Sequence, residues 1–157
     1  MPFWALSFVE FLHSLAAITW FGGAIWMKFV VKPALRKGFT DPLDPVLKDF
    51  LRRSTPIFAI AGTSTVLLGV LRGTVFGPIN SWSVLVGTPY GNTWLVALIV
   101  ALLTANLGGT GRLLEKILSS KDPGWLASGG LTMTLEWVEL FGFATMLCCM
   151  VLMKFGM

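Results

Sequence analysis

The sequence predicts an all-α protein, a polytopic membrane bundle of four transmembrane helices in a single domain over residues 1–157. Of its 157 residues, 55% are hydrophobic and 13% are charged, and the mean hydropathy of +0.76 is outside the range of soluble domains. Apolar runs occupy residues 3–31, 56–76, 93–114 and 130–155. Each run supplies the ~20 residues that cross a hydrocarbon core. Little chain remains for a separate soluble domain.

The basic residues predict the orientation of this bundle. Ten of the 12 Lys and Arg residues flank or fill the first and third connections, and the second connection has none. The positive-inside rule then places both termini outside and the first and third connections in the cytoplasm. We expect a multi-pass protein of the cell (inner) membrane. The net charge of +4 is explained by topology, so we expect the lipid bilayer, and no nucleic acid, as partner.

The first connection includes a segment with the pattern of an interfacial helix. Asp44 can cap a short helix whose first turn holds Pro45, and the apolar side chains over residues 44–53 oppose the charged ones. We expect this helix to lie on the cytoplasmic membrane surface. It would be separate from the span that begins at Pro56.

The second and third spans are predicted to pack closely against other helices. Gly69, Gly73 and Gly77 repeat at every fourth position, a spacing that lets another backbone approach. Such faces also suit a homodimer or a larger membrane complex. Residues 89–92 have the composition of a turn, so we expect the third span to begin at residue 93.

The first span carries Glu10 and His13, the latter the only histidine, at a depth where ionisable groups need partners. Arg72 lies near the outer end of the antiparallel second span, at a comparable depth. We predict an ion pair between Glu10 and Arg72, with His13 one turn deeper. In the alternative, Arg72 reaches outer phosphates and His13 bonds to a neighbouring carbonyl or hydroxyl.

Acids and sulfur atoms share one stripe of the fourth span. Glu136 and Glu139 occupy its inner half, where Arg112 at the end of the third span is the natural partner for Glu136. Glu139 lies near mid-membrane, and we expect it to be protonated or paired. Whether these acids move protons or only pack is left open by the sequence.

The outer half of the same stripe carries thioethers and a thiol. Sulfur and imidazole are the ligands that soft Cu(I) prefers. In the alternative, the methionines simply fill the core. The geometry of the spans permits a metal site made of His13, Met146, Cys149, Met150 and Met153.

Two segments resemble a known family. They are LHSLAAITWFGGAIWMKFVVKPAL in the first span and TPYGNTWLVAL at the start of the third. The first resembles the opening helix of the copper-resistance protein D superfamily, with a helix-borne His, a Trp-x-Gly-Gly turn and a later Pro. The resemblance implies copper transport, and it carries His13 over as the matching histidine. The membrane-bound protoporphyrinogen oxidase family, which uses haem, has a similar His helix. The Lys that those families tend to have after the Tyr-Gly pair is absent here.

Three classes of function follow. A copper-handling protein would bind or transport Cu(I) through His13 and the sulfur stripe. A redox protein would use His13 as an axial ligand of haem b, with Met or a second chain supplying the other ligand. A non-catalytic accessory subunit would use its glycine faces for docking. The sequence has no phosphate loop, nucleophile-base pair or zinc spacing, which favours a protein without enzymatic activity.

Overall fold

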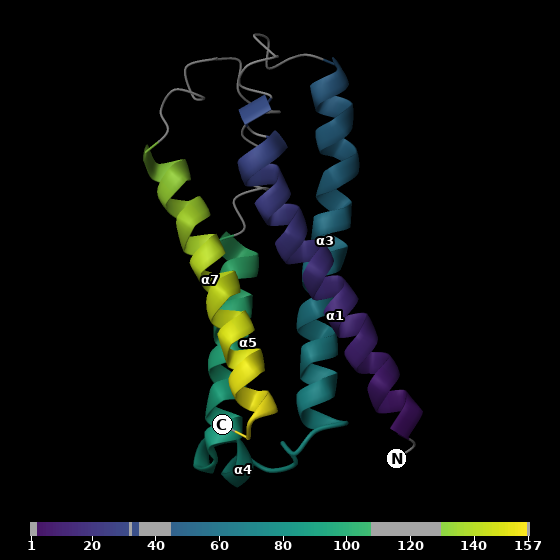
Figure 1. Ribbon diagram of the computed structural model, residues 1–157, viewed down its shortest axis with the longest axis vertical. Coiled ribbons are helices and arrows are strands. Elements are labelled where there is room, and N and C mark those ends of the chain that lie inside the picture. The colour runs from purple at the N-terminus through teal and green to yellow at the C-terminus, as the bar shows by residue number, and fades with distance from the viewer. Residues whose placement is uncertain (1–2, 32, 35–44, 108–129, 157) are drawn as a thin grey trace.

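The computed structural model describes residues 3–31, 33–34, 45–107 and 130–156 (Figure 1). All secondary-structure elements of these residues are helical, which confirms the all-α prediction. The elements are α1 (Phe3–Trp26), the π-helical segment η1 (Met27–Val31), α3 (Pro45–Thr74), α4 (Trp82–Gly87), α5 (Pro89–Leu107) and α7 (Gly130–Lys154). The first predicted span therefore corresponds to α1 and η1 together.

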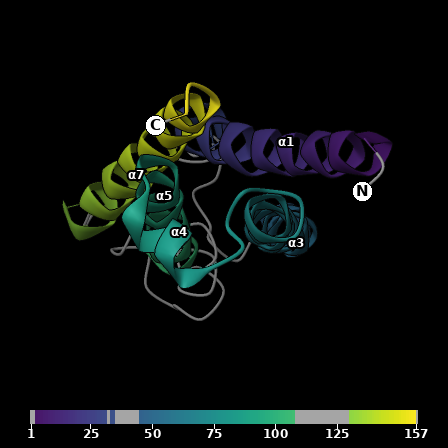
Figure 2. The same cartoon turned by 90° about the horizontal axis from the view of Figure 1, so that it is seen from below.

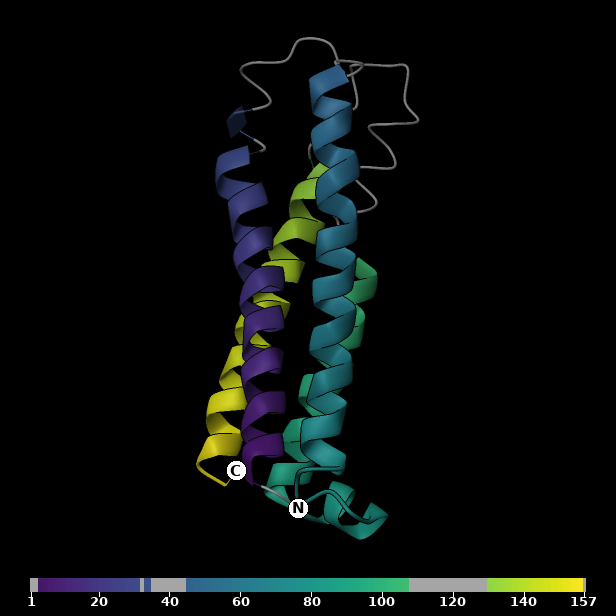
Figure 3. The same ribbon diagram turned by 90° about the vertical axis from the view of Figure 1, so that its right-hand side faces the viewer.

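The long helices associate as two pairs. The helix α1 packs along α3, and α5 packs along α7, as Figures 1 and 3 show. A view along the bundle places the second pair beside the first, with α4 below α5 (Figure 2). Both chain ends and α4 lie at the same end of the bundle.

Three helical stretches are long and apolar enough to cross a membrane among the described residues, namely Trp4–Val31, Arg52–Thr74 and Trp137–Lys154. Their outer faces carry large exposed hydrophobic side chains, such as Phe8, Ile60 and Phe141. Such faces are typical of a protein whose surroundings are lipid. These features indicate a membrane protein. Helix α5 includes residues 93–107 of the predicted third span, and residues 108–114 lie outside the described part of the chain.

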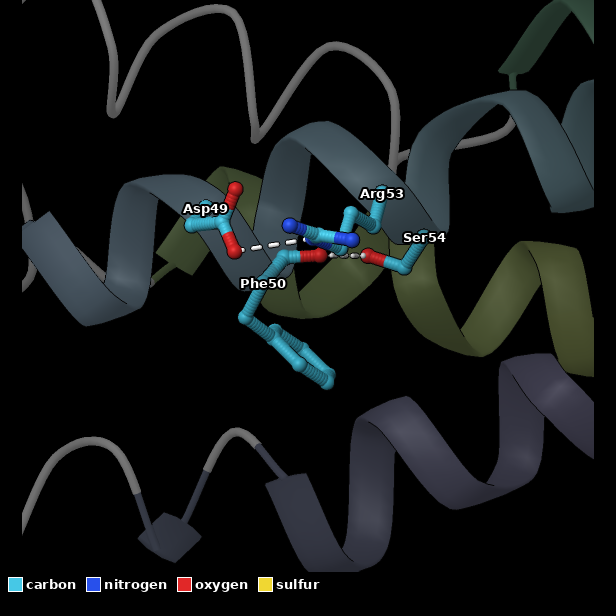
Figure 4. A network of polar contacts seen from close by, with 4 residues as sticks. All are labelled: Asp49, Phe50, Arg53 and Ser54. Atoms are coloured by element: carbon cyan, nitrogen blue, oxygen red, sulfur yellow. Dashed lines mark hydrogen bonds and ion pairs between the residues drawn. The ribbon is translucent and has the colours of Figure 1, made fainter.

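The expectation of a separate interfacial helix over residues 44–53 is wrong, because α3 runs without a break from Pro45 through Pro56 to Thr74. Side chains support the turns before Pro56 (Figure 4). Arg53 Nε donates to Asp49 Oδ2 at 2.8 Å, and Ser54 Oγ donates to the Phe50 carbonyl at 2.9 Å. Proline is tolerated in membrane helices where nearby hydroxyls and the next turns satisfy the backbone.

The helix α5 begins at Pro89, so the turn expected over residues 89–92 is also wrong. Proline suits the first position of a helix because its missing N–H has no partner there. The preceding Thr88 caps the helix, since its Oγ1 accepts the Gly91 N–H at 3.0 Å. The earlier start adds Tyr90 and Gly91 to the helix.

A small aromatic core joins the two helix pairs. Phe143 of α7 is 3% exposed, and its ring lies 4.9 Å from that of Trp20 and 5.0 Å from that of Phe21 in α1. Gly62 of α3 permits this packing, because a Cβ there would lie 3.1 Å from the Trp20 indole. Trp20, Phe21 and Phe143 also line the cavity described next.

Candidate functional site

A cavity of about 300 Å³ lies between α1, α3, α5 and α7. Most of its wall is apolar, and the polar groups on it are few. This combination is typical of sites for small ligands. Its lining consists of His13, Ser14, Ala17, Ile18, Trp20, Phe21, Thr65, Val66, Gly69, Arg72, Gly73, Tyr90, Trp94, Ala97, Leu98, Ala101, Phe143, Met146, Leu147, Met150 and Met153.

His13 is buried in this wall and held by one hydrogen bond. Its Nδ1 lies 3.0 Å from the Thr65 carbonyl oxygen. Because a carbonyl oxygen only accepts, Nδ1 carries the proton and donates. The neutral ring therefore keeps its lone pair on Nε2.

Gly69 makes this hydrogen bond possible. The imidazole lies across the glycine, and a Cβ at that position would come within 3.1 Å of His13 Cε1. A larger residue would keep the ring away from the α3 backbone, where the Thr65 carbonyl is found. The small-residue face predicted for helix packing thus accommodates the histidine.

The other ring nitrogen, Nε2, has no hydrogen-bond partner within the described part of the chain. Nε2 is also not completely buried there. A ring whose Nδ1–H is fixed by a carbonyl and whose Nε2 is free has the arrangement of most metal-bound histidines.

Glu10 and Arg72 form an ion pair beside His13, and of the two Arg72 lines the cavity. Arg72 Nη2 donates to Glu10 Oε1 at 2.9 Å, which links α1 to α3 one turn from His13. The Arg72 side chain is 29% exposed and the Glu10 side chain is 53% exposed. The pair is therefore partly exposed.

Three sulfur atoms of the predicted metal site come from one face of α7. Met146, Met150 and Met153 line the same cavity as His13. Cys149 is buried, with a free thiol, but does not line it. Successive helix residues point ~100° apart, so the turn that directs Met146 and Met150 inward directs Cys149 sideways. Cys149 therefore lies beside the wall that His13 and the three methionines share, and its place in a metal site stays a prediction.

Glu139 belongs to a second cluster, toward the inner end of α7. It is buried at 6% exposed and interacts electrostatically with Lys28 of η1. The Lys28 ammonium lies 3.6 Å from the centre of the Trp137 ring. The predicted pair of Arg112 and Glu136 cannot be placed, since Arg112 and the Glu136 side chain lie outside the described residues.

Sequence reasoning missed four residues of these clusters. Thr65 contributes only a backbone oxygen, which has no sequence signature. Tyr90 and Trp94 lie one turn apart on α5 and share a face, and Trp94 Nε1 donates to the Gly69 carbonyl at 3.4 Å. Lys28 lies in η1, at the end of the first apolar run. The sequence signal for Lys28 was a basic residue inside an apolar run, five residues after Gly23.

The donor atoms in the cavity are soft or neutral. They comprise one imidazole, three thioethers and a few hydroxyls; the Arg72 guanidinium also lines the cavity, and no carboxylate is among the described lining residues. Over the described residues there is also no group of three or more His, Cys, Asp or Glu that could hold a metal ion. Such a set does not suit Mg²⁺ or Ca²⁺, and it resembles the ligands that Cu(I) prefers.

Comparison with models of known protein families, with curated proteins and with solved structures gave no match.

Proposed function

We propose that this protein is a multi-pass membrane protein that binds a transition metal, most favourably Cu(I), through His13 and the methionines of α7. The observation that carries the proposal is the hydrogen bond from His13 Nδ1 to the Thr65 carbonyl. It leaves the lone pair of Nε2 available on a residue that lines the same cavity as Met146, Met150 and Met153. Binding or transport of copper is the function that this arrangement supports best.

We further propose that the bundle crosses the cell (inner) membrane four times, with both termini outside. Three helical stretches have the length and apolar character of spans, and α5 supplies 19 further helical residues. Both termini and α4 lie at one end of the bundle (Figure 1). That end includes the connection without Lys or Arg, as the positive-inside rule requires of the outer side.

The chemistry of the site follows from its ligands. Thioethers are soft ligands, so Met146, Met150 and Met153 suit Cu(I). The His13 imidazole is the stronger donor, and its bond to Thr65 fixes the orientation of the ring.

The test is a Cu(I) affinity measurement on the protein purified in mild detergent, by competition with a chromogenic Cu(I) chelator. We expect one Cu(I) per chain. His13→Ala and Met150→Leu should each weaken binding by about 10-fold or more, the scale of losses at metal sites. Met27→Leu is the matched control, because Met27 does not line the cavity. Equal affinity in all four proteins would overturn the proposal.

Haem b is the second candidate. The observation in its favour is that His13 of α1 and Met150 of α7 line one apolar cavity that also has aromatic walls, including Trp20, Trp94 and Phe143. His and Met together are a known axial ligand set. A Soret band in the purified protein that His13→Ala abolishes would favour haem over copper. A protein with neither copper nor pigment would favour the accessory-subunit class.

A further inference from the structure

The cavity opens toward the lipid between α1 and α7. Two of its lining residues are also strongly exposed on the outside of the bundle, namely Ile18 of α1 at 69% and Leu147 of α7 at 45%. These helices touch over a short stretch only, and toward the end with both termini α1 diverges from α7 in two perpendicular views (Figures 1 and 2). In a bilayer, a molecule dissolved among the lipid tails would meet this opening directly.

His13 defines what kind of molecule fits inside. His13 lines the cavity, and with Nδ1–H committed to Thr65 the hydrogen-bonding atom left on the neutral ring is the acceptor Nε2. In the absence of a metal ion this acceptor can be satisfied by an O–H or N–H donor. A hydrogen bond to this acceptor contributes favourable free energy, so an occupant with a hydroxyl is preferred over one without.

The remaining wall favours an apolar body. Trp94, Phe143 and Met150 present rings and a thioether, and the small residues Ala17 and Ala97 leave room between them. The volume of about 300 Å³ is twice that of an engineered cavity of ~150 Å³ that binds benzene. It can therefore hold a phenol or alcohol with a short apolar tail.

We infer that the cavity binds a bilayer-soluble phenol or alcohol, which enters between α1 and α7 and donates its hydroxyl hydrogen to His13 Nε2. This ligand goes beyond the proposed metal function and uses the same lone pair in the metal-free protein. The two occupants would compete for His13.

The experiment uses 4-hexylphenol and its methyl ether, which differ by the hydroxyl hydrogen. Binding to the full chain in lipid nanodiscs is measured by equilibrium dialysis, with empty nanodiscs to correct for partition into lipid. A Cu(I) chelator is present throughout, so the result does not depend on metal binding. We expect one phenol per chain, bound at least tenfold more tightly than the ether. His13→Phe should reduce this ratio to about one.

A second pair of variants tests the cavity itself. Ala97→Phe fills it and should weaken the binding of both compounds. Ala59→Phe adds the same ring to an exposed position of α3 outside the cavity and should change neither. Equal affinity of phenol and ether in the unmodified protein would overturn the inference. Equal binding of the phenol by Ala97→Phe and Ala59→Phe would overturn it as well. The unmodified protein decides the first point even if His13→Phe fails to fold.

Discussion

Gly69→Ala tests whether His13 is held in place as a ligand, because it moves the imidazole without removing it. The new Cβ would lie 3.1 Å from His13 Cε1, whereas carbon pairs are most stable at about 3.5–4.0 Å. The ring must therefore move by about 0.5 Å, which stretches the 3.0 Å bond between Nδ1 and the Thr65 oxygen to the limit of a hydrogen bond.

The magnitude follows from that displacement. A net hydrogen bond is worth about 1 kcal/mol, and loss of the group that orients a metal-bound histidine costs about 10- to 100-fold in affinity. Alanine also favours the helix over glycine by about 1 kcal/mol, which offsets the strain. We therefore expect weaker Cu(I) binding with little change in the free energy of unfolding.

The assay is chelator competition for Cu(I), combined with denaturation in mixed detergent micelles. Gly22→Ala is the matched control, since a Cβ there has no heavy atom within 4 Å. It should bind Cu(I) as the unmodified protein does. If Gly69→Ala binds Cu(I) as tightly as Gly22→Ala, the bond to Thr65 does not orient a ligand and the reasoning is refuted.

Three further predictions concern contacts between helices. Gly142→Ala should destabilise the bundle by about 1–3 kcal/mol in detergent denaturation, because the new Cβ would collide with Thr104 Oγ1; a change no larger than that of Gly22→Ala would show that α5 and α7 separate easily. Trp137→Leu should lower the free energy of unfolding by about 1–2 kcal/mol in the same assay, because it removes the ring next to the Lys28 ammonium. Trp26→Leu removes a ring without such a contact in the described residues and should cost less. Equal losses would count against the cation–π contact. Glu10→Gln should change stability by less than about 1 kcal/mol, because the ion pair with Arg72 is partly exposed; a much larger loss, measured by denaturation, would mean that lipid shields the pair from water.

The long apolar helices were predictable from apolar length and composition, although α3 and α5 begin earlier than predicted. The pairing of Glu10 with Arg72 also followed from depth, since two antiparallel spans place these residues near the same level. The structure puts their side chains 2.9 Å apart. The break expected before Pro56 was not found, because the turns that precede this residue are supported by side-chain hydrogen bonds. A proline alone does not reveal such support.

The site was less predictable than the fold. The partner of His13 is a backbone oxygen of α3, and any residue type could supply it. Cys149 differs from its neighbour Met150 by a single step along α7, yet that step of ~100° decides whether a side chain reaches the cavity. Periodicity identifies a stripe, but the rotation of the helix against its neighbours decides which edge of the stripe faces inward.

The most direct test of the metal site is nitrogen NMR of the protein labelled with ¹⁵N-histidine. The chain has a single histidine, so the spectrum reports His13 alone. The account predicts a neutral ring with the proton on Nδ1 and, when Cu(I) is added, a large shift of the Nε2 resonance. A proton on Nε2 in the metal-free protein, or a Nε2 resonance that ignores Cu(I), would contradict it.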